Sequence, residues 1–159
     1  MGEYLVGAYL KMVVGCDVVD YGVRLPGGKL RGLHEIDVIG FKFSDRSVWM
    51  CEAVTHLTGA LYGDYDRTVK KLGEKIKFHH DYADGRLQHF PARSSMLWAP
   101  WVSSGLRTRL DLELPEVELV VNQEYAKRID VLLDLAREGA HDTGNPAFRV
   151  LQILGHIHR

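Results

Sequence analysis

The spacing of apolar and polar residues predicts a chain of alternating helices and strands. Apolar residues recur every three or four positions from Glu3 to about Val14, which predicts an amphipathic helix that Gly15 can end. Runs rich in β-branched and aromatic residues predict strands at 17–25, 34–43, 47–56, 94–102 and 117–121. Helical spacing returns at about 66–82, 124–137 and 146–157, with Asp66, Asn122 and Pro146 at the expected helix starts.

This order of elements predicts the fold class. One helix, three strands, a helix, two strands and two helices are typical of an α/β domain in which helices cover a central mixed sheet. A short turn at 44–46 joins the second and third strands as a hairpin, and the segment 26–32 is expected to be an exposed loop. No Pro/Gly/Ser-rich linker divides the 159 residues, so we expect a single domain over 1–159.

Composition and charge narrow the class of protein. Hydrophobic residues make up 46% and charged residues 26%, which excludes a disordered tail and a disulfide-dependent mini-scaffold. Twenty basic and 21 acidic side chains give a net charge of −1, so any affinity for nucleic acid would need a local basic patch. The range 66–93 carries seven basic and four acidic side chains, a local balance of +3, and can contact phosphates. The range 111–124 is acidic and unsuited to DNA.

The cysteines and the start of the chain bear on its environment. Cys16 and Cys51 form no C-x-x-C pair, which argues against a thiolate zinc cluster. Glu3 stands where a secretory signal would carry positive charge, and no apolar run approaches the roughly 18 residues that a membrane span needs. We therefore expect a cytoplasmic protein with reduced cysteines and no membrane association.

Two acidic residues interrupt neighbouring apolar strands. Because alternate residues of a strand share a face, Asp37 lies on the face of Ile39, and Glu52 lies on the face of Met50. An ionised carboxylate inside an apolar strand is costly unless it is paired or bound to a metal. Mg²⁺ is commonly held by one or two carboxylates and several waters. Asp37 and Glu52 are therefore candidates either for a divalent-cation site or for simple pairing with Lys or Arg.

These residues carry a resemblance. A helix with Glu3, then HEIDVIG, a short turn and VWMCEAV resembles the PD-(D/E)XK nuclease superfamily, the restriction-endonuclease-like fold that includes Holliday-junction resolvases. The resemblance covers about residues 2–83. Asp37 matches the motif Asp, Glu52 matches the Glu, and Glu3 matches the first-helix acid of the resolvase-like branches. It implies a restriction-endonuclease-like mixed central sheet flanked by helices, Mg²⁺ or Mn²⁺ at Asp37 and Glu52, hydrolysis of DNA phosphodiester bonds, and a homodimer.

The sequence departs from the motif at one position. The Lys of Glu-x-Lys, which orients the attacking water or steadies the transition state, is Val54 here. In some members of the superfamily this Lys has moved to the following helix, where Lys71 and Lys75 share a face in this chain. His56 would share the face of Glu52 if the strand extends that far, and could act as a base or an electrophile. The alternative is a catalytically inactive nuclease-fold module that binds nucleic acid or a protein partner.

Each further candidate also has an ordinary structural explanation. Glu3 suits a solvated first helical turn, and His56 suits a strand end bonded to backbone. Either lysine can belong to a solvated helix face. The pair 79–80 is expected to be partly exposed, and Trp98 and Trp101 are expected in the core or an interface rather than as base-stacking platforms. A helix lysine within reach of the two carboxylates would favour the nuclease over the inactive module.

Overall fold

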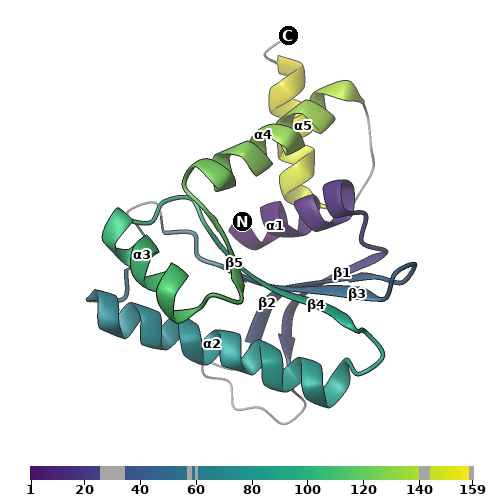
Figure 1. The fold of residues 1–159 in the computed structure, drawn as a ribbon. Coiled ribbons are helices and arrows are strands. Elements are labelled where there is room, and N and C mark those ends of the chain that lie inside the picture. Colours follow the sequence, from purple (N-terminus) through teal and green to yellow (C-terminus); the bar gives the residue numbers. More distant parts are fainter. Residues whose placement is uncertain (26–34, 57–58, 60, 140–143, 158–159) are drawn as a thin grey trace.

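The computed structural model describes residues 1–25, 35–56, 59, 61–139 and 144–157. Within them the chain forms an α/β fold, an open five-stranded mixed sheet with five helices (Figure 1). The strands are β1 (Val18–Arg24), β2 (Glu35–Lys42), β3 (Ser47–Ala53), β4 (Ala92–Ala99) and β5 (Val117–Val121). The helices are α1 (Gly2–Tyr9), α2 (Tyr65–Arg86), α3 (Ser104–Glu113), α4 (Gln123–Glu138) and α5 (Pro146–Ile157), and a π-helical turn, η1 (Leu10–Val14), extends α1.

The strands lie in the sheet in their sequence order, from β1 to β5. β1, β2 and β3 form an antiparallel meander, whereas β3, β4 and β5 are parallel to one another. The difference follows from the connections, because a short turn reverses the chain and a helix carries it back to the same end of the sheet. α2 is the crossover between β3 and β4, and α3 is the crossover between β4 and β5. β3 is therefore the strand at which the two halves of the sheet meet.

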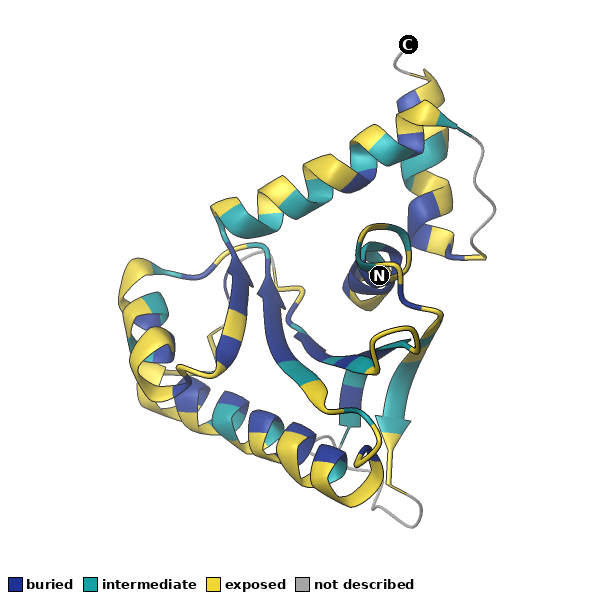
Figure 2. Ribbon diagram, turned by 45° about the vertical axis from the view of Figure 1, so that its right-hand side comes forward, coloured by how far each residue is buried: buried dark blue, intermediate teal, exposed yellow. Residues whose placement is uncertain are grey.

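Helices cover both faces of the sheet. α2 and α3 lie on one face, and α1 and α4 lie on the other, with α5 packed against α1 and α4 (Figure 1). The strands of the sheet and the inward sides of the helices are largely buried, while the outward sides are exposed (Figure 2). The face under α2 and α3 carries Asp37 and Glu52, so it is the face that matters for the candidate chemistry.

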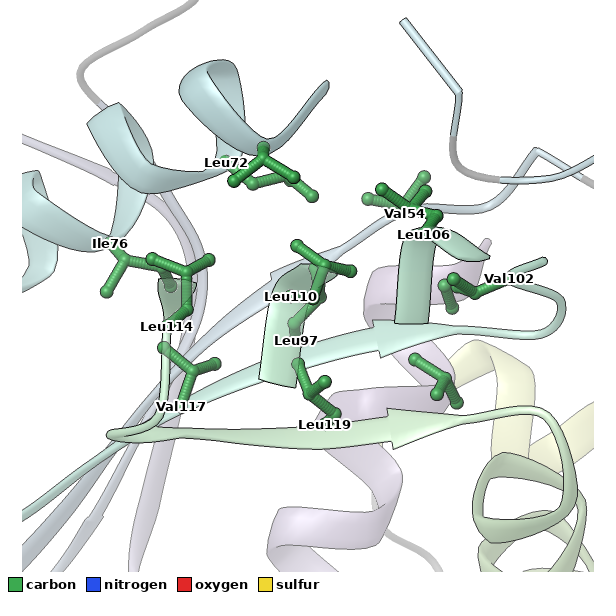
Figure 3. Packing of buried hydrophobic residues seen from close by; sticks show 13 residues of the cluster. Val54, Leu72, Ile76, Leu97, Val102, Leu106, Leu110, Leu114, Val117 and Leu119 are labelled. Carbon is green, nitrogen blue, oxygen red and sulfur yellow. The ribbon is translucent and has the colours of Figure 1, made fainter. Parts of the chain in front are cut away.

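An apolar cluster fills the space between that face and its two helices (Figure 3). Leu72 of α2, Leu97 of β4 and Leu106 of α3 are each at most 1% exposed within it. Val54, directly after β3, packs into the same cluster and is 3% exposed. The cluster fixes how α2 lies over the sheet, and thereby where the polar residues of α2 meet the strands.

Most of the predicted elements are confirmed, including all five strands and the helices at the predicted places. One element was missed, because α3 was not predicted between the last two strands. Its signals are visible in retrospect: the Ser103 side chain accepts a hydrogen bond from the Leu106 N–H at its start, and Leu106 and Leu110 form its buried side.

Several predicted boundaries differ from the structure, two of them next to the candidate residues. The cap of α2 is Asp64 rather than Asp66, because the Asp64 carboxylate accepts a hydrogen bond from the Arg67 N–H at 2.8 Å. β3 ends at Ala53, three residues before the predicted end, so His56 does not belong to the strand. The predicted loop at 26–32 falls outside the described residues. Among the described helices, none is both long and apolar enough to cross a membrane.

Candidate functional site

Asp37 and Glu52 lie on neighbouring strands, each one residue beyond Val38 and Cys51, the last pair of the β2–β3 register. Glu52 points to the face that α2 covers, because its carboxylate meets Lys75 of that helix. Asp37 lies on the same side through its neighbour Tyr62, which packs against the cluster beneath α2. The sequence prediction that these two residues share a face is consistent with this register.

Lys75 of α2 reaches the same place. Its Nζ donates to Glu52 Oε1 in a short charged hydrogen bond. The Glu52 side chain is 2% exposed and the Lys75 side chain 12%, so the pair is largely removed from water. The two charges attract each other strongly because little water screens them. Removing either one leaves the other buried without a compensating charge. Of the two carboxylates, Lys75 therefore contacts Glu52, and its predicted catalytic role stays a prediction.

Asp37 is anchored to the strand that carries Glu52. Its Oδ2 accepts a hydrogen bond from the Ala53 N–H at 2.8 Å, directly after Glu52 in the chain. Asp37 is only partly buried, whereas Glu52 is buried. The site therefore opens to solvent on the Asp37 side and is closed on the Lys75 side.

Tyr62, in the connection between β3 and α2, forms the rim of the site. The Lys71 ammonium lies 3.8 Å from the centre of the Tyr62 ring, and the His56 ring meets Tyr62 edge-on at 6.3 Å. Burial, together with the nearby Asp37 carboxylate, raises the pKa of Tyr62. Lys71 and His56 therefore both contact Tyr62, which lies beside Asp37. Their link to the site is Tyr62 rather than Glu52.

One oxygen at the centre of the site is unaccounted for. Glu52 Oε1 bonds to Lys75, but Glu52 Oε2 is buried and has no hydrogen-bond partner among the described residues. A buried carboxylate oxygen without a partner carries a desolvation cost, which a cation or a bound water would remove. Carboxylate oxygens such as this one and those of Asp37 are the donor type that a hard cation such as Mg²⁺ prefers.

The described residues contain no gathering of three or more His, Cys, Asp or Glu side chains that could hold a metal on their own. Any ion here would depend on Asp37, Glu52, backbone oxygens and water. Mg²⁺ keeps several waters and is usually bound through one or two carboxylates, so this donor set suits Mg²⁺ or Mn²⁺ better than zinc.

Val54 belongs to the apolar core. Its side chain packs among Leu72, Val102 and Leu106, where an ammonium would be buried in an apolar environment (Figure 3). Its backbone N–H donates to the Trp98 carbonyl at 2.8 Å, which keeps the chain aligned with β4 beyond the end of β3.

Glu3 lies in the first turn of α1, near the end of β3. Gly2, the first residue of α1, sits against Thr55, so the start of α1 reaches the end of the sheet where β3 finishes. Glu3 itself is exposed, and in the described part of the chain no bond joins it to Asp37, Glu52 or Lys75. The predicted role of Glu3 stays a prediction.

His79 was expected to be partly exposed, and that expectation is wrong. It follows Lys75 by one helical turn, is fully buried, and neither ring nitrogen has a hydrogen-bond partner among the described residues. Burial, with smaller effects from His80 and Lys75, lowers the pKa of His79 to about 3, so the ring is neutral at ordinary pH. Its place on the inward stripe of α2, four residues after Lys75, is the signal that could have indicated burial.

The basic range 66–93, predicted to contact phosphates, is divided between ion pairs and the candidate site. Several of its charges are already in ion pairs, Lys77 with Asp81 and Arg93 with Asp84. Lys75 meets the Glu52 carboxylate, and Lys71 lies over the ring of Tyr62. Only one end of this range can therefore serve the site.

No protein-family model, no curated protein and no solved structure matches this chain. The chemistry open to the site follows from its own residues.

Proposed function

We propose that this protein is a metal-dependent nuclease that hydrolyses DNA phosphodiester bonds, with a restriction-endonuclease-like fold. The observation that carries the proposal is the contact of Lys75, from α2, with Glu52, next to the Ala53 N–H that holds the Asp37 carboxylate. Two carboxylates and a lysine are the set that the nuclease resemblance requires, although the lysine comes from another element. The order of elements from α1 to β4, with three antiparallel strands and a parallel fourth, supports the same fold.

The metal would be held by Asp37 and Glu52 Oε2. The unpartnered buried oxygen of Glu52 is the structural reason to expect an ion there. When bound, a divalent cation of this kind supplies Lewis-acid polarisation of a phosphoryl oxygen and lowers the pKa of a coordinated water. Glu52 Oε1 accepts the hydrogen bond from Lys75. The two oxygens of this carboxylate would therefore bind different partners, Oε1 the lysine and Oε2 the metal.

Lys75 holds a positive charge where negative charge would develop on the phosphoryl group. A fixed charge of this kind in a poorly hydrated site stabilises a transition state without reorganising solvent. The hydrogen bond from Lys75 holds the Glu52 carboxylate in its orientation. The Ala53 N–H in turn fixes the Asp37 carboxylate against β3.

DNA cleavage tests the proposal. Labelled linear, nicked, single-stranded and four-way-junction DNA would be incubated with Mg²⁺ or Mn²⁺ and with wild-type protein, Asp37→Asn, Glu52→Gln or Lys75→Met. Asp45→Asn is the matched control, because Asp45 is an exposed acid in the β2–β3 turn at the other end of these strands. Far-UV circular dichroism would verify that each variant is folded.

We expect metal-dependent cleavage by wild type and by Asp45→Asn, and a loss of at least about a hundredfold in each of the other three variants. Cleavage that persists in Asp37→Asn would point to a contaminating enzyme or another site. No cleavage of any substrate by folded wild-type protein would reject the nuclease and favour the inactive module.

A further inference from the structure

An exposed tryptophan stands at the end of the sheet that carries the site. Trp101 is 51% exposed, whereas Trp98, three residues earlier, is 1% exposed and belongs to the core. A half-exposed indole forgoes the favourable free energy that burying its apolar surface would give. Of the two tryptophans expected in a core or an interface, Trp98 lies in the core and Trp101 does not.

The backbone is shaped to support this ring. Gly59 is buried beneath the indole, and a Cβ at that position would lie 2.5 Å from the ring. Gly59 also has a φ of +109°, which residues with side chains rarely adopt. The indole thus rests on glycine backbone, which holds its orientation while half of its surface stays in contact with water.

Trp101 and the candidate site share one end of the sheet. β3 and β4 are parallel, with Ala53 paired with Trp98, so the residues just after both strands lie at the same edge. The connection after β3 supports Trp101 at Gly59 and then supplies Tyr62, which is next to Asp37 and carries the Lys71 ammonium on its ring. One segment therefore links an exposed aromatic surface to a lysine and to the carboxylates.

Other exposed apolar groups continue this surface. Leu61, in the same connection, is 47% exposed, and Tyr65, at the start of α2, is 38% exposed and bonded to Ser103. Aromatic rings beside basic side chains are how proteins hold single-stranded nucleic acid, since every base has a face to stack on. In a duplex the faces of the bases are already stacked on their neighbours, so an indole of this kind selects unpaired bases.

We propose that Trp101 stacks on an unpaired base, and that the substrate of the site is a single-stranded polynucleotide or a single-stranded segment of a larger DNA. The backbone of the strand would pass Lys71 on its way to Asp37 and Glu52. This inference rests on the proposed function, because it names the substrate of the same site. Trp101 acts as a specificity-determining residue and takes no part in the bond cleavage.

Binding without cleavage tests the stacking. An Asp37→Asn background in EDTA prevents hydrolysis, and fluorescence anisotropy would report the binding of a labelled oligothymidine and of a blunt duplex of equal length. In this background Trp101→Ala removes the ring, and Trp101→Phe keeps an aromatic face. Phe43→Ala is the matched control, because Phe43 is 56% exposed and lies at the opposite end of β2.

We expect the single strand to bind more tightly than the duplex, and Trp101→Ala to weaken the single-strand affinity at least about fivefold. Trp101→Phe should keep most of the affinity, and Phe43→Ala should keep all of it. The single strand should also quench the tryptophan fluorescence of the Asp37→Asn protein, with little quenching after Trp101→Phe.

Equal single-strand affinity with and without the Trp101 ring, tighter binding of the duplex, or no single-strand binding up to millimolar protein would overturn the inference. The cleavage assay separates this failure from failure of the nuclease. Metal-dependent cleavage together with Trp101-independent binding rejects the stacking role alone. Trp101-dependent binding without cleavage by wild type rejects the nuclease and leaves a single-strand binding surface.

Discussion

Lys75 and Glu52 are the most closely coupled residues of the candidate site, and their energetics can be tested apart from catalysis. Lys75→Met leaves the Glu52 carboxylate buried without its partner, and we expect it to lower the free energy of unfolding by about 3–5 kcal/mol. The double variant Glu52→Gln/Lys75→Met removes both charges and should recover most of that loss. Urea denaturation at pH 7.5 gives both values.

The control for this pair is Lys77→Met on the same helix. Lys77 forms an exposed ion pair with Asp81, which contributes at most about 1 kcal/mol. A loss for Lys75→Met no larger than that of Lys77→Met would show that Lys75 and Glu52 do not pair as described.

His79 makes a second prediction at the residue scale, about pH. Its pKa of about 3 in the folded protein lies below the value near 6.5 expected for an unfolded chain, so unfolding takes up a proton between these limits. The stability that neutral His79 contributes is complete above pH 6.5 and is lost as the pH falls toward 3. Within that window its contribution falls by about 1.4 kcal/mol per pH unit.

Urea denaturation of wild type and His79→Leu at pH 7.5, 5.5 and 4.5 checks this. As the pH falls, the free energy of unfolding of wild type should decrease relative to that of His79→Leu. Only the wild-type chain takes up a proton at residue 79 when it unfolds. A difference that stays constant with pH would mean that His79 already accepts a proton in the folded state.

At the scale of elements, the core position of Val54 can be tested directly. Val54→Lys places an ammonium in the apolar cluster under α2 and α3, and we expect a loss of about 3–5 kcal/mol in the free energy of unfolding. Val18→Lys on β1 is the control, since Val18 is 45% exposed and should tolerate the change. Thermal denaturation measures both.

If Val54→Lys proves as stable as Val18→Lys, residue 54 must have access to water. The core position assigned to its side chain would then be wrong.

The elements that the sequence predicted are those with strong local signals. β-branched alternation marks β2 and β3, and apolar spacing marks α2 and α4, so their positions could be predicted from the residues alone. α3 was missed because it has only three apolar residues, Leu106, Leu110 and Leu112, in a largely polar segment, and depends on tertiary packing.

The candidate site was predictable only in part. The parity of residues along a strand places Asp37 and Glu52 on one face, and the helical repeat puts Lys71 and Lys75 together. Which lysine meets Glu52 depends on how α2 crosses the sheet, and that is set by packing of Leu72 and Ile76 that no local pattern specifies. The role of Tyr62 was missed for the same reason, since a connecting segment carries no periodicity.

At the scale of the whole molecule, the chemistry gathers at one end of one face. β3 belongs to both the antiparallel and the parallel half of the sheet, and the candidate site forms where its carboxyl end meets the helix that follows. Ligands of open α/β sheets commonly bind beyond the carboxyl ends of the parallel strands. A chain with a net charge of −1 does not attract a polyanion as a whole, so the proposed binding of DNA would depend on the local lysines.

The central claim is that Asp37 and Glu52 hold a divalent cation, and titration with Mn²⁺ tests it most directly. Isothermal titration calorimetry of wild-type protein should show one site, which Asp37→Asn weakens at least about tenfold while Asp45→Asn leaves it unchanged. Asp37→Asn keeps an oxygen for the Ala53 N–H, so its fold should persist. No binding by folded wild type at millimolar Mn²⁺, or equal binding by Asp37→Asn, would contradict the metal site and the nuclease that depends on it.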